Sequence, residues 1–495
     1  MRTTVLPFLL AGAGSALAAL EVDFESTSSI KAAAKDVAFD LMSYYKGNQS
    51  GEIPGLFPMP DGKYDWWANA LVWSTMIDYW RYTGDDTYNN VTIEGLMFQR
   101  GPSLEQPFLP ANYSVFTLNE HQALWGIAAM QAAEAGFPST PDGAPSWIEL
   151  AKAVFDSQAA RYSAEEACGG GLRMSISTQS ALWNSKDTAS TAIFLNLGAR
   201  LYRFTGNETY GEWVERGWNW LTAIGLVDQQ MNVWDVSHDG AGSKWNCSES
   251  TIIKLRLSNP ASLLLQAAAY MTTQTPKSVD TANWQARLHA LTGSTLTHFF
   301  PTTNTSSPNT LVEPYCERYP ESVCHGRPEH FYKGMAMRYV TGAAALVPDF
   351  RGPEHAVARA LRATAEGAAG ACNGGGGPGG QEGRECGFRW TGGEAAREDR
   401  TKGGVVRELN ALAAVMAPLV DGAAELLRDG EGGDGGEDGG EDGNGGGGGQ
   451  GGEGGDGGDG NGDGTEGGDG NGENAGASTK ATMGLVLAGL AAALL

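Results

Sequence analysis

Aromatic and short polar residues occur together at several points where helices are expected to begin. Trp66 and Trp67 open one expected helix, and residues 119–122 (Asn-Glu-His-Gln) open another, followed by Trp125. Rings that stack on the C–H faces of a sugar, beside carboxylates that bond its hydroxyls, are suited to binding carbohydrate. Because each aromatic residue taken singly also fits a hydrophobic core, these residues become candidates only when considered together.

Two further segments combine glycine with polar groups. The run Cys168-Gly-Gly-Gly-Leu-Arg173 predicts a bend, but it lacks the Lys-Ser/Thr pair and the preceding strand of a phosphate-binding loop. Asp239-Gly240 follows Trp234 and is more often a turn than a ligand site.

Cys324-His325 has no second pair at zinc-ligand spacing, so we expect no metal site and no cofactor.

The acidic charge of the chain is concentrated near its C-terminal end. The 495 residues carry a net charge of −24. Residues 429–473 hold 14 acidic residues and 26 glycines but no lysine or arginine, and without them the net charge is −10. No basic face is present to neutralise phosphates, so nucleic-acid binding is not expected. The rest of the chain holds nearly all of the aromatic residues and is able to bury a large core.

Both ends resemble targeting segments. Residues 1–18 combine Arg2, an apolar stretch and an Ala-x-Ala ending, which predicts a secretory signal peptide; a buried first helix is the alternative. The last thirteen residues are apolar and too short to span a bilayer. They follow small residues and a polar spacer, which predicts a glycosylphosphatidylinositol (GPI) attachment signal over 477–495, with Asn474 as the attachment residue. The alternative is a tail-anchored or degraded C-terminus.

These signals predict a secreted protein held on the extracellular face of the plasma membrane or in the cell wall. Its folded body would occupy residues 19–428 and act as a monomer. Residues 429–476 cannot bury enough apolar surface to offset chain entropy, so a disordered, self-repelling stalk is expected there.

A secreted chain is expected to oxidise its six cysteines. Short separations suggest that Cys316 pairs with Cys324 and Cys372 with Cys386, which leaves Cys168 and Cys247, although sequence alone does not fix the connectivity. Glycosylation sequons, each a weak signal by itself, occur at Asn48, Asn90, Asn112, Asn207, Asn246 and Asn304.

The body is predicted to be all-helical. The segment Tyr82–Tyr88 resembles Phe204–Tyr210, 122 residues later, and each follows one apolar helix and opens the next. Repeated helical hairpins predict a closed helical toroid or a solenoid. Apolar residues recur with a period near 3.6 in the segments 29–45, 66–83, 119–136, 147–162, 187–205, 209–224, 260–273, 281–297, 330–346, 354–368 and 403–427.

Short motifs in a preserved order span roughly residues 30 to 420. They include Tyr44-Tyr-Lys-Gly-Asn48, Ile53-Pro-Gly55, Trp66-Trp67, Ile77-Asp-Tyr-Trp80, Tyr82-Thr-Gly-Asp85, Trp125-Gly126, Ala132-Ala-Glu134, Cys168-Gly-Gly-Gly-Leu-Arg173, Ala199-Arg-Leu201, Asp239-Gly240, Ala268-Ala-Tyr-Met271, Lys333-Gly334 and Cys386 with Trp390. Together they resemble glycoside hydrolase family 76, in particular its fungal GPI-anchored mannan endo-1,6-alpha-mannosidase-like cell-wall proteins. The resemblance implies an (α/α)6 barrel with its site in a cleft formed by the inner helices.

The chain departs from that family at the expected catalytic pair. Where the family has two consecutive aspartates between Asn and Gln, this chain has Glu120 and His121. By position, the resemblance makes Glu120 the nucleophile and His121 the acid/base of a retaining glycosidase. An acidic wall would keep His121 charged, whereas a place in the first helical turn, with Asn119 as the N-cap, disfavours a cation.

Three other aspartates, Asp65, Asp187 and Asp239, are candidates for a second carboxylate. Several family aromatics are also replaced, among them those of the segment that reads Arg256-Leu-Ser-Asn259 here, which removes sugar platforms. We expect substrate contacts from Trp66, Trp67, Asn119, Gln122, Trp125, Arg173 and Asp239.

The leading hypothesis is an endo-acting retaining hydrolase or transglycosidase on α-1,6-mannosidic linkages of mannan or of a GPI-anchor glycan, in cell-wall biogenesis. The alternative is a catalytically impaired wall protein that binds the same glycans without cutting them. A weaker third hypothesis is another (α/α)-barrel activity, such as a lyase or an inverting glucosidase.

Overall fold

The computed structural model describes residues 20–58, 65–109, 117–162, 168–238, 252–273, 280–304, 306–318, 324, 327–372, 385–392 and 404–423. The chain divides into two compact units, residues 1–434 and 435–495, and the second lies outside the described residues. The predicted signal peptide, the glycine-rich acidic segment and the GPI signal with Asn474 also lie outside them and remain predictions.

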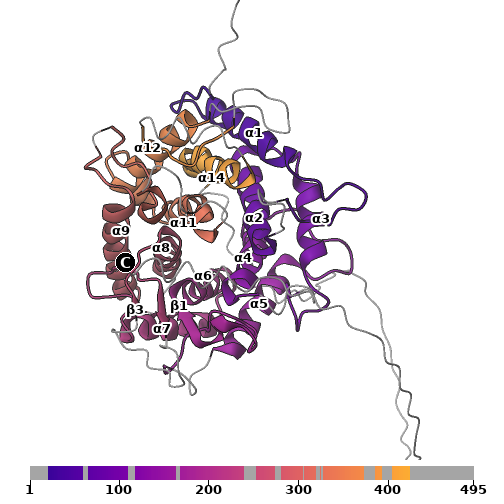
Figure 1. Cartoon of the computed structure of the whole chain (residues 1–495), viewed down its shortest axis with the longest axis vertical. Coiled ribbons are helices and arrows are strands. Elements are labelled where there is room, and N and C mark those ends of the chain that lie inside the picture. The colour runs from indigo at the N-terminus through magenta and orange to yellow at the C-terminus, as the bar shows by residue number, and fades with distance from the viewer. Residues whose placement is uncertain are drawn as a thin grey trace, which may run out of the picture. The chain divides into compact units, whose positions relative to one another are not determined.

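The described part of the body is built from two concentric layers of helices (Figure 1). The inner helices are α2 (Trp66–Thr83), α4 (Asn119–Ala135), α6 (Thr188–Thr205), α8 (Ser258–Thr272), α11 (Tyr332–Leu346) and α14 (Val405–Met416). The outer helices are α1 (Thr27–Ser43), α3 (Asn89–Gln99), α5 (Trp147–Arg161), α7 (Glu208–Ala223), α9 (Thr281–Phe299) and α12 (Ala356–Gly370).

Each inner helix packs against the next one, and α14 packs against α2, so the inner ring closes. The outer helices cover the inner ones, for example α5 on α4, α7 on α6 and α9 on α8. The predicted (α/α)6 barrel is therefore confirmed.

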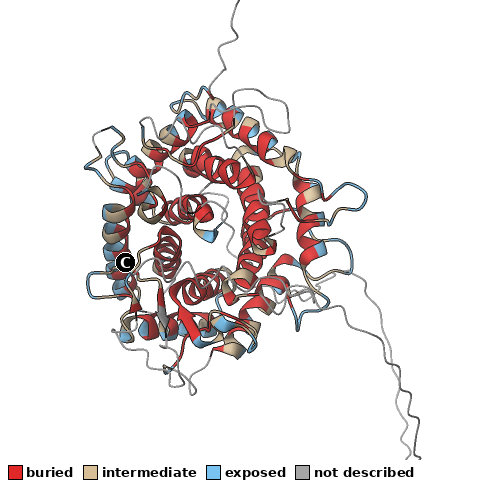
Figure 2. Cartoon of the chain, viewed as in Figure 1, coloured by how far each residue is buried: buried red, intermediate tan, exposed pale blue. Residues whose placement is uncertain are grey.

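Burial follows from the composition of the two layers (Figure 2). The inner helices are buried around most of their circumference, as expected for helices that are apolar or small on every face. The outer helix α7 instead buries one stripe, including Tyr210, Val214 and Leu221, and leaves its other face to solvent.

Turn chemistry sets the ends of the inner helices. Gly84, Gly136 and Gly206 each adopt the left-handed conformation directly after α2, α4 and α6, the usual place of glycine at a C-cap. The two similar segments at 82–88 and 204–210 are the connections from α2 to α3 and from α6 to α7. Each outer helix runs back toward the end of the barrel where the preceding inner helix began. The inner helices therefore all begin at the same end of the barrel.

Two features are not predicted by the sequence pattern. Helix α3 is missing from the expected helices because Val91, Thr92 and Gly95 weaken its propensity. Its packing explains why it forms: a Cβ atom at Gly95 would lie 2.7 Å from the ring of Trp73, so glycine lets α3 approach α2 closely.

The second feature is a small antiparallel sheet with the strand order β1 (Ser185–Asp187), β2 (Val236–His238) and β3 (Ile252–Ile253). Asp187, the last residue of β1, is paired with Val236. The sheet therefore brings the start of α6 next to Asp235, which precedes β2. The remaining short helices are α10 (Pro314–Glu317) and α15 (Val420–Ala423), with the 3₁₀ helices η1 (Ala181–Asn184), η3 (Pro328–Phe331), η4 (Pro348–Arg351) and η5 (Ala417–Leu419).

Two of the predicted disulfides are confirmed, Cys316–Cys324 and Cys372–Cys386. Cys168 is also disulfide-bonded, but Cys247 lies outside the described residues, so that pairing stays a prediction.

The sequons at Asn48, Asn90 and Asn207 are exposed, and the one at Asn304 is half-buried. Asn112 and Asn246 lie outside the described residues, and glycosylation remains a prediction for all six. Within the described ranges, no helix combines the length and apolarity needed to cross a bilayer.

Candidate functional site

Glu120 lies in the first turn of α4, at the end of the barrel where the inner helices begin. Its side chain is half-buried, and Oε1 accepts a hydrogen bond of 2.8 Å from Nδ2 of Asn259, the second residue of α8. A contact from α4 to α8 shows that Glu120 points into the ring and not toward the outer helices. The first turn of a helix favours an anion, yet burial opposes it.

Glu120 belongs to a cluster of four carboxyl groups from different elements. Burial, followed by the negative charge of Asp187 and smaller contributions from Asp235 and Glu329, raises its pKa to about 8. Burial also raises the pKa of Asp187 to about 6, and burial together with Asp187 and Glu329 raises that of Asp235 to about 7. At neutral pH the carboxyl of Glu120 therefore holds a proton.

His121 differs from the charged residue expected from the sequence. Burial lowers its pKa to about 3, so the imidazole is neutral. Nδ1 accepts a hydrogen bond of 3.4 Å from the backbone N–H of Leu118, which leaves the ring proton on Nε2. The ring stacks on Trp67 with centroids 5.2 Å apart. The effect of burial on the pKa of His121 is larger than that of the acidic wall expected to keep it charged. A neutral imidazole is a weak proton donor.

Asn119 and Gln122 lie behind this pair, with exposed fractions of 1% and 0%. Asn119 is the first residue of α4 and not its N-cap; its Nδ2 donates to the Arg173 carbonyl and its Oδ1 accepts from Nε of Arg161. Gln122 donates to the carbonyl of Pro107 and accepts from the same guanidinium. Their amides are thus occupied by protein groups, and we assign them a positioning role in place of the expected substrate contact.

The expected sugar platforms divide into a buried pair and one half-buried ring. Trp66 and Trp125 are 4% and 0% exposed and stack on each other with centroids 5.5 Å apart, so both pack in the core. Trp67 is half-buried and contacts Phe331, which precedes α11, at 4.9 Å. Of the three tryptophans, Trp67 keeps the surface that a sugar ring needs.

The glycine-rich bend supports the start of α4. Gly171 has φ of +80°, and a Cβ atom there would lie 2.3 Å from the ring of Trp220. Only glycine allows this approach. Arg173 is 7% exposed, donates to the carbonyl of Trp183 and stacks on that ring. These contacts join the bend to the 3₁₀ helix that contains Trp183. Asp239 lies outside the described residues, and its role stays a prediction.

Sequence reasoning missed Asn259, Asp235, Glu329 and Tyr332 as members of this site. Burial, followed by Glu120, Glu329 and Asp235, raises the pKa of Tyr332 well above its usual value. A signal was available for Asn259, which closes the segment at 256–259 that differs from its family counterpart. Asp235 and Glu329 carried no such signal, because single carboxylates in loops are common.

The inner helices are also polar farther along their length, but the polar groups are differently arranged there. Arg338 Nε donates to Asp78 at 2.7 Å, and Arg200 Nε donates to Glu134 at 3.0 Å. Asp78, Arg200 and Arg338 border a small cavity, together with Gln131 and others. Among the described residues no cluster of His, Cys, Asp and Glu has the arrangement needed to hold a metal ion.

Comparison with known proteins identifies this arrangement. The profile of glycosyl hydrolase family 76 matches residues 29–429. The chain belongs to this family. It is 33% identical over 371 residues to the mannan endo-1,6-alpha-mannosidase DCW1 of Candida glabrata. The aligned region covers 75% of this chain and 76% of that relative. The protein is therefore a member of a glycoside hydrolase family.

Solved structures of the family share the fold. The crystal structure of Dfg5 from Chaetomium thermophilum in complex with glucosamine is 34% identical, with a TM-score of 0.69, and covers 81% of this chain and 92% of that one. An inactive variant of an α-1,6-mannanase from Salegentibacter sp., bound to α-1,6-mannotriose, is 19% identical with a TM-score of 0.58. The match covers 79% of this chain and 99% of that one. The second likeness concerns the fold alone.

Proposed function

We propose that this chain cleaves α-1,6-mannosidic linkages within a mannose polymer, retaining the configuration at C1. The substrate is mannan or the mannose core of a GPI glycan, and the acceptor is water or a wall sugar. Membership of the family and the relatives named mannan endo-1,6-alpha-mannosidase support this class of substrate. The predicted signal peptide and GPI signal place the reaction outside the plasma membrane.

The observation that carries the proposal is the protonated, half-buried carboxyl of Glu120. A general acid must hold its proton at the working pH and release it to the departing oxygen. Glu120 meets the first requirement, and the Asn259 amide fixes Oε1 so that Oε2 is left to carry the proton. Glu120 therefore takes the acid/base role that the sequence suggested for His121.

The remaining groups then have supporting tasks. Asp187 is 2% exposed, and its Oδ2 accepts from the backbone N–H of Ser190, so it acts on Glu120 through its charge and does not reach substrate. Trp67, held between His121 and Phe331, offers a ring edge and face to a mannose unit.

The test uses the secreted full-length chain, purified from a fungal host and incubated with α-1,6-mannotetraose. We expect shorter oligosaccharides whose newly formed reducing end appears first as the α anomer in proton NMR. A first product in the β form would overturn retention. Longer products would show transfer to a sugar acceptor.

The second candidate function, glycan binding without cleavage, is favoured by the neutral imidazole of His121 at a catalytic position. Saturable binding of mannotetraose in calorimetry, with no product after prolonged incubation, would support it against the proposal. Absence of both binding and cleavage would reject both functions for this substrate.

A further inference from the structure

The family's two carboxylates are adjacent in sequence, but here the second of these positions is a neutral imidazole. A retaining glycosidase needs two carboxyl groups on opposite faces of the sugar ring, about 5 to 5.5 Å apart. The question raised by this structure is which group stands opposite Glu120.

The order of helices around the ring gives the first answer. The inner helices follow one another as α2, α4, α6, α8, α11 and α14, so α4 and α11 lie on opposite sides of the barrel axis (Figure 1). Asp187 begins α6, the immediate neighbour of α4, and thus shares a wall with Glu120. Glu329 lies in η3, directly before α11, and comes from the opposite wall.

Glu329 also has a side chain available for reaction. It is half-buried, interacts electrostatically with Glu120 across the ring, and has a buried Oε2 without a hydrogen-bond partner. A buried carboxylate oxygen without a partner is costly, and such groups persist where they serve a function. Asp187 also has a buried oxygen without a partner, Oδ1, but it is almost completely covered, and its Oδ2 caps α6.

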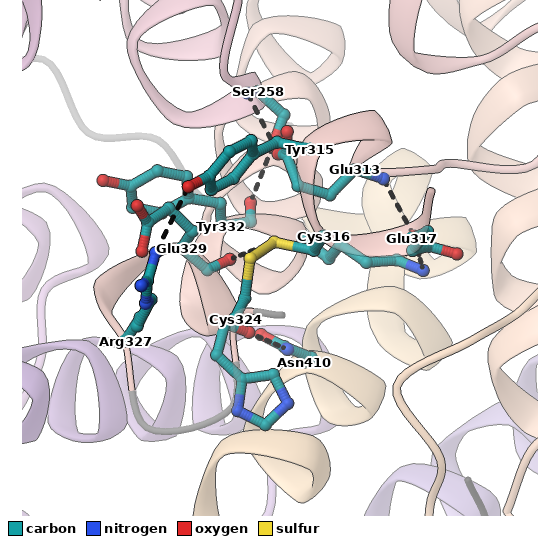
Figure 3. Close-up of a disulfide and its surroundings, with 12 residues drawn as sticks. Ser258, Glu313, Tyr315, Cys316, Glu317, Cys324, Arg327, Glu329, Tyr332 and Asn410 are labelled. Atoms are coloured by element: carbon teal, nitrogen blue, oxygen red, sulfur yellow. Dashed lines mark hydrogen bonds and ion pairs between the residues drawn. A yellow bond between two sulfur atoms is a disulfide. The ribbon is translucent and has the colours of Figure 1, made fainter. Parts of the chain in front are cut away.

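The backbone around Glu329 is held firmly. Its carbonyl oxygen lies 3.7 Å from Sγ of Cys316, which is bonded to Cys324 (Figure 3). On the other side, the Tyr332 carbonyl accepts a hydrogen bond from the hydroxyl of Ser258 on α8. The side chains of Glu329 and Tyr332 extend to the same side, away from the disulfide (Figure 3).

Phe331, in the same turn as Glu329, contacts Trp67 at 4.9 Å. Since Trp67 also stacks on His121, one aromatic chain links the turn that carries Glu329 to the turn that carries Glu120. The two carboxyl groups are thereby fixed relative to each other by packing and not only by the barrel.

We propose that Glu329 is the second catalytic carboxyl of this enzyme, the nucleophile that faces Glu120 across the inner ring. This assignment rests on the proposed function. An oxygen of the Glu329 carboxylate forms a bond to C1 of the mannosyl unit while the bond from C1 to O6 of the next mannose breaks. The proton of Glu120 passes to O6, and the shortened glycan leaves as an alcohol.

The second half of the reaction restores both groups. The Glu120 carboxylate takes a proton from water, or from a sugar hydroxyl in transfer, and the oxygen so activated attacks C1. The bond between C1 and Glu329 breaks, the carboxylate is regenerated, and Glu120 is again protonated. Two displacements retain the configuration at C1.

The test compares Glu329→Gly, Glu329→Gln and Glu120→Ala with the wild-type chain. The substrate is 2,4-dinitrophenyl α-1,6-mannobioside, whose leaving group needs no proton, with and without sodium azide. We expect both Glu329 variants to lose at least about 1,000-fold in turnover. Azide should restore turnover in Glu329→Gly and yield the β-mannosyl azide, because it replaces the nucleophile on its own face.

Glu120→Ala should give the α-mannosyl azide instead, since azide then intercepts the covalent intermediate. Glu354→Gln, an exposed position, is the matched control and should retain wild-type turnover. Melting curves of all variants separate loss of a reacting group from loss of the fold, and the recovery by azide in Glu329→Gly requires a folded site.

Asp235→Asn distinguishes the nearest rival, since Asp235 is also half-buried and close to Glu329. A β-mannosyl azide from a variant of Asp235 or Glu120, or a Glu329→Gln variant within about threefold of wild type, would overturn the assignment. A wild-type chain that cleaves neither this substrate nor mannotetraose would instead reject the proposed function itself.

Discussion

The two ends of the inner ring contain the same kinds of residues in opposite arrangements. Where the helices begin, Glu120, Asp187, Asp235 and Glu329 lie near one another, and no arginine or lysine is among the main influences on the first three. Farther along the same helices, buried acids are matched by guanidinium groups, Asp78 by Arg338 and Glu134 by Arg200.

This difference separates stability from chemistry. A buried acid that is paired with a cation and hydrogen-bonded is ionised and structural, and breaking the pair leaves an uncompensated charge. Glu120, a buried acid among other acids, holds its proton to unusually high pH and is able to transfer it. The carboxyl groups to which we assign the chemistry thus lie at the end where the inner helices start.

The largest expected effect falls on activity when Glu120 is changed to Gln. Loss of the proton donor should lower kcat on α-1,6-mannotetraose by about 10²- to 10⁴-fold, while the melting temperature stays equal or rises because one repelled acid is removed. Kinetics and a melting curve on the same preparation check this. If Glu120→Gln were active but strongly destabilised, Glu120 would stabilise the fold, and the comparison between the two ends would be wrong.

The next effect falls on stability when Glu134 is changed to Gln. Arg200 would keep its charge in a buried place without its partner, which costs about 3 to 5 kcal/mol of unfolding free energy. Urea unfolding measures it, with Glu366→Gln in an exposed pair as the control. An unchanged urea midpoint would show that the Glu134–Arg200 pair does not stabilise the fold.

Stability should also depend on pH through the unpaired cluster. Folding raises the pKa of Glu120 from 4.5 to about 8 and that of Asp235 from 3.8 to about 7. A raised carboxyl pKa means that the folded state binds more protons, so the contribution of these two groups to the free energy of unfolding is largest below about pH 4 and falls as pH rises toward 8. Urea midpoints across this range test the sign, and Glu120→Gln should flatten the slope.

A smaller effect is expected from Asp187→Asn. Removing the largest charge acting on Glu120 lowers the pKa of that carboxyl, so the alkaline limit of kcat should move to lower pH. A pH–rate profile shows this directly, and a merely structural role for Asp187 would change the amplitude without moving the limit.

The smallest effect is expected from His121→Ala. Because the imidazole is neutral and stacked on Trp67, its loss should change kcat less than about tenfold and act mainly on KM through the position of that ring. Initial rates over a range of mannotetraose concentrations separate the two parameters. A loss as large as that of Glu120→Gln would return the acid/base role to His121.

Local sequence was sufficient for the helices of the barrel. The 3.6-residue period placed α2, α4 and α9 within a few residues of their observed bounds, and glycines after α2, α4 and α6 marked their ends. Helix α3 was missed because Gly95 lowers its propensity, and only contact with Trp73 explains it. The roles expected for Trp66 and Trp125 could not be judged from sequence, since a buried and an exposed tryptophan look alike there.

By itself, the sequence determined the family, the helical character of the body and the place of Glu120 and His121 in a first helical turn, since all of these follow from neighbouring residues and motif order. It also suggested the two local disulfides through their short separations, which the structure confirms. Only the tertiary structure decided that His121 is neutral and that Asn259, Asp235 and Glu329 surround Glu120. Glu329 lies 209 residues further along the chain than Glu120, and closure of the ring, not any local pattern, sets their separation and their electrostatic environment.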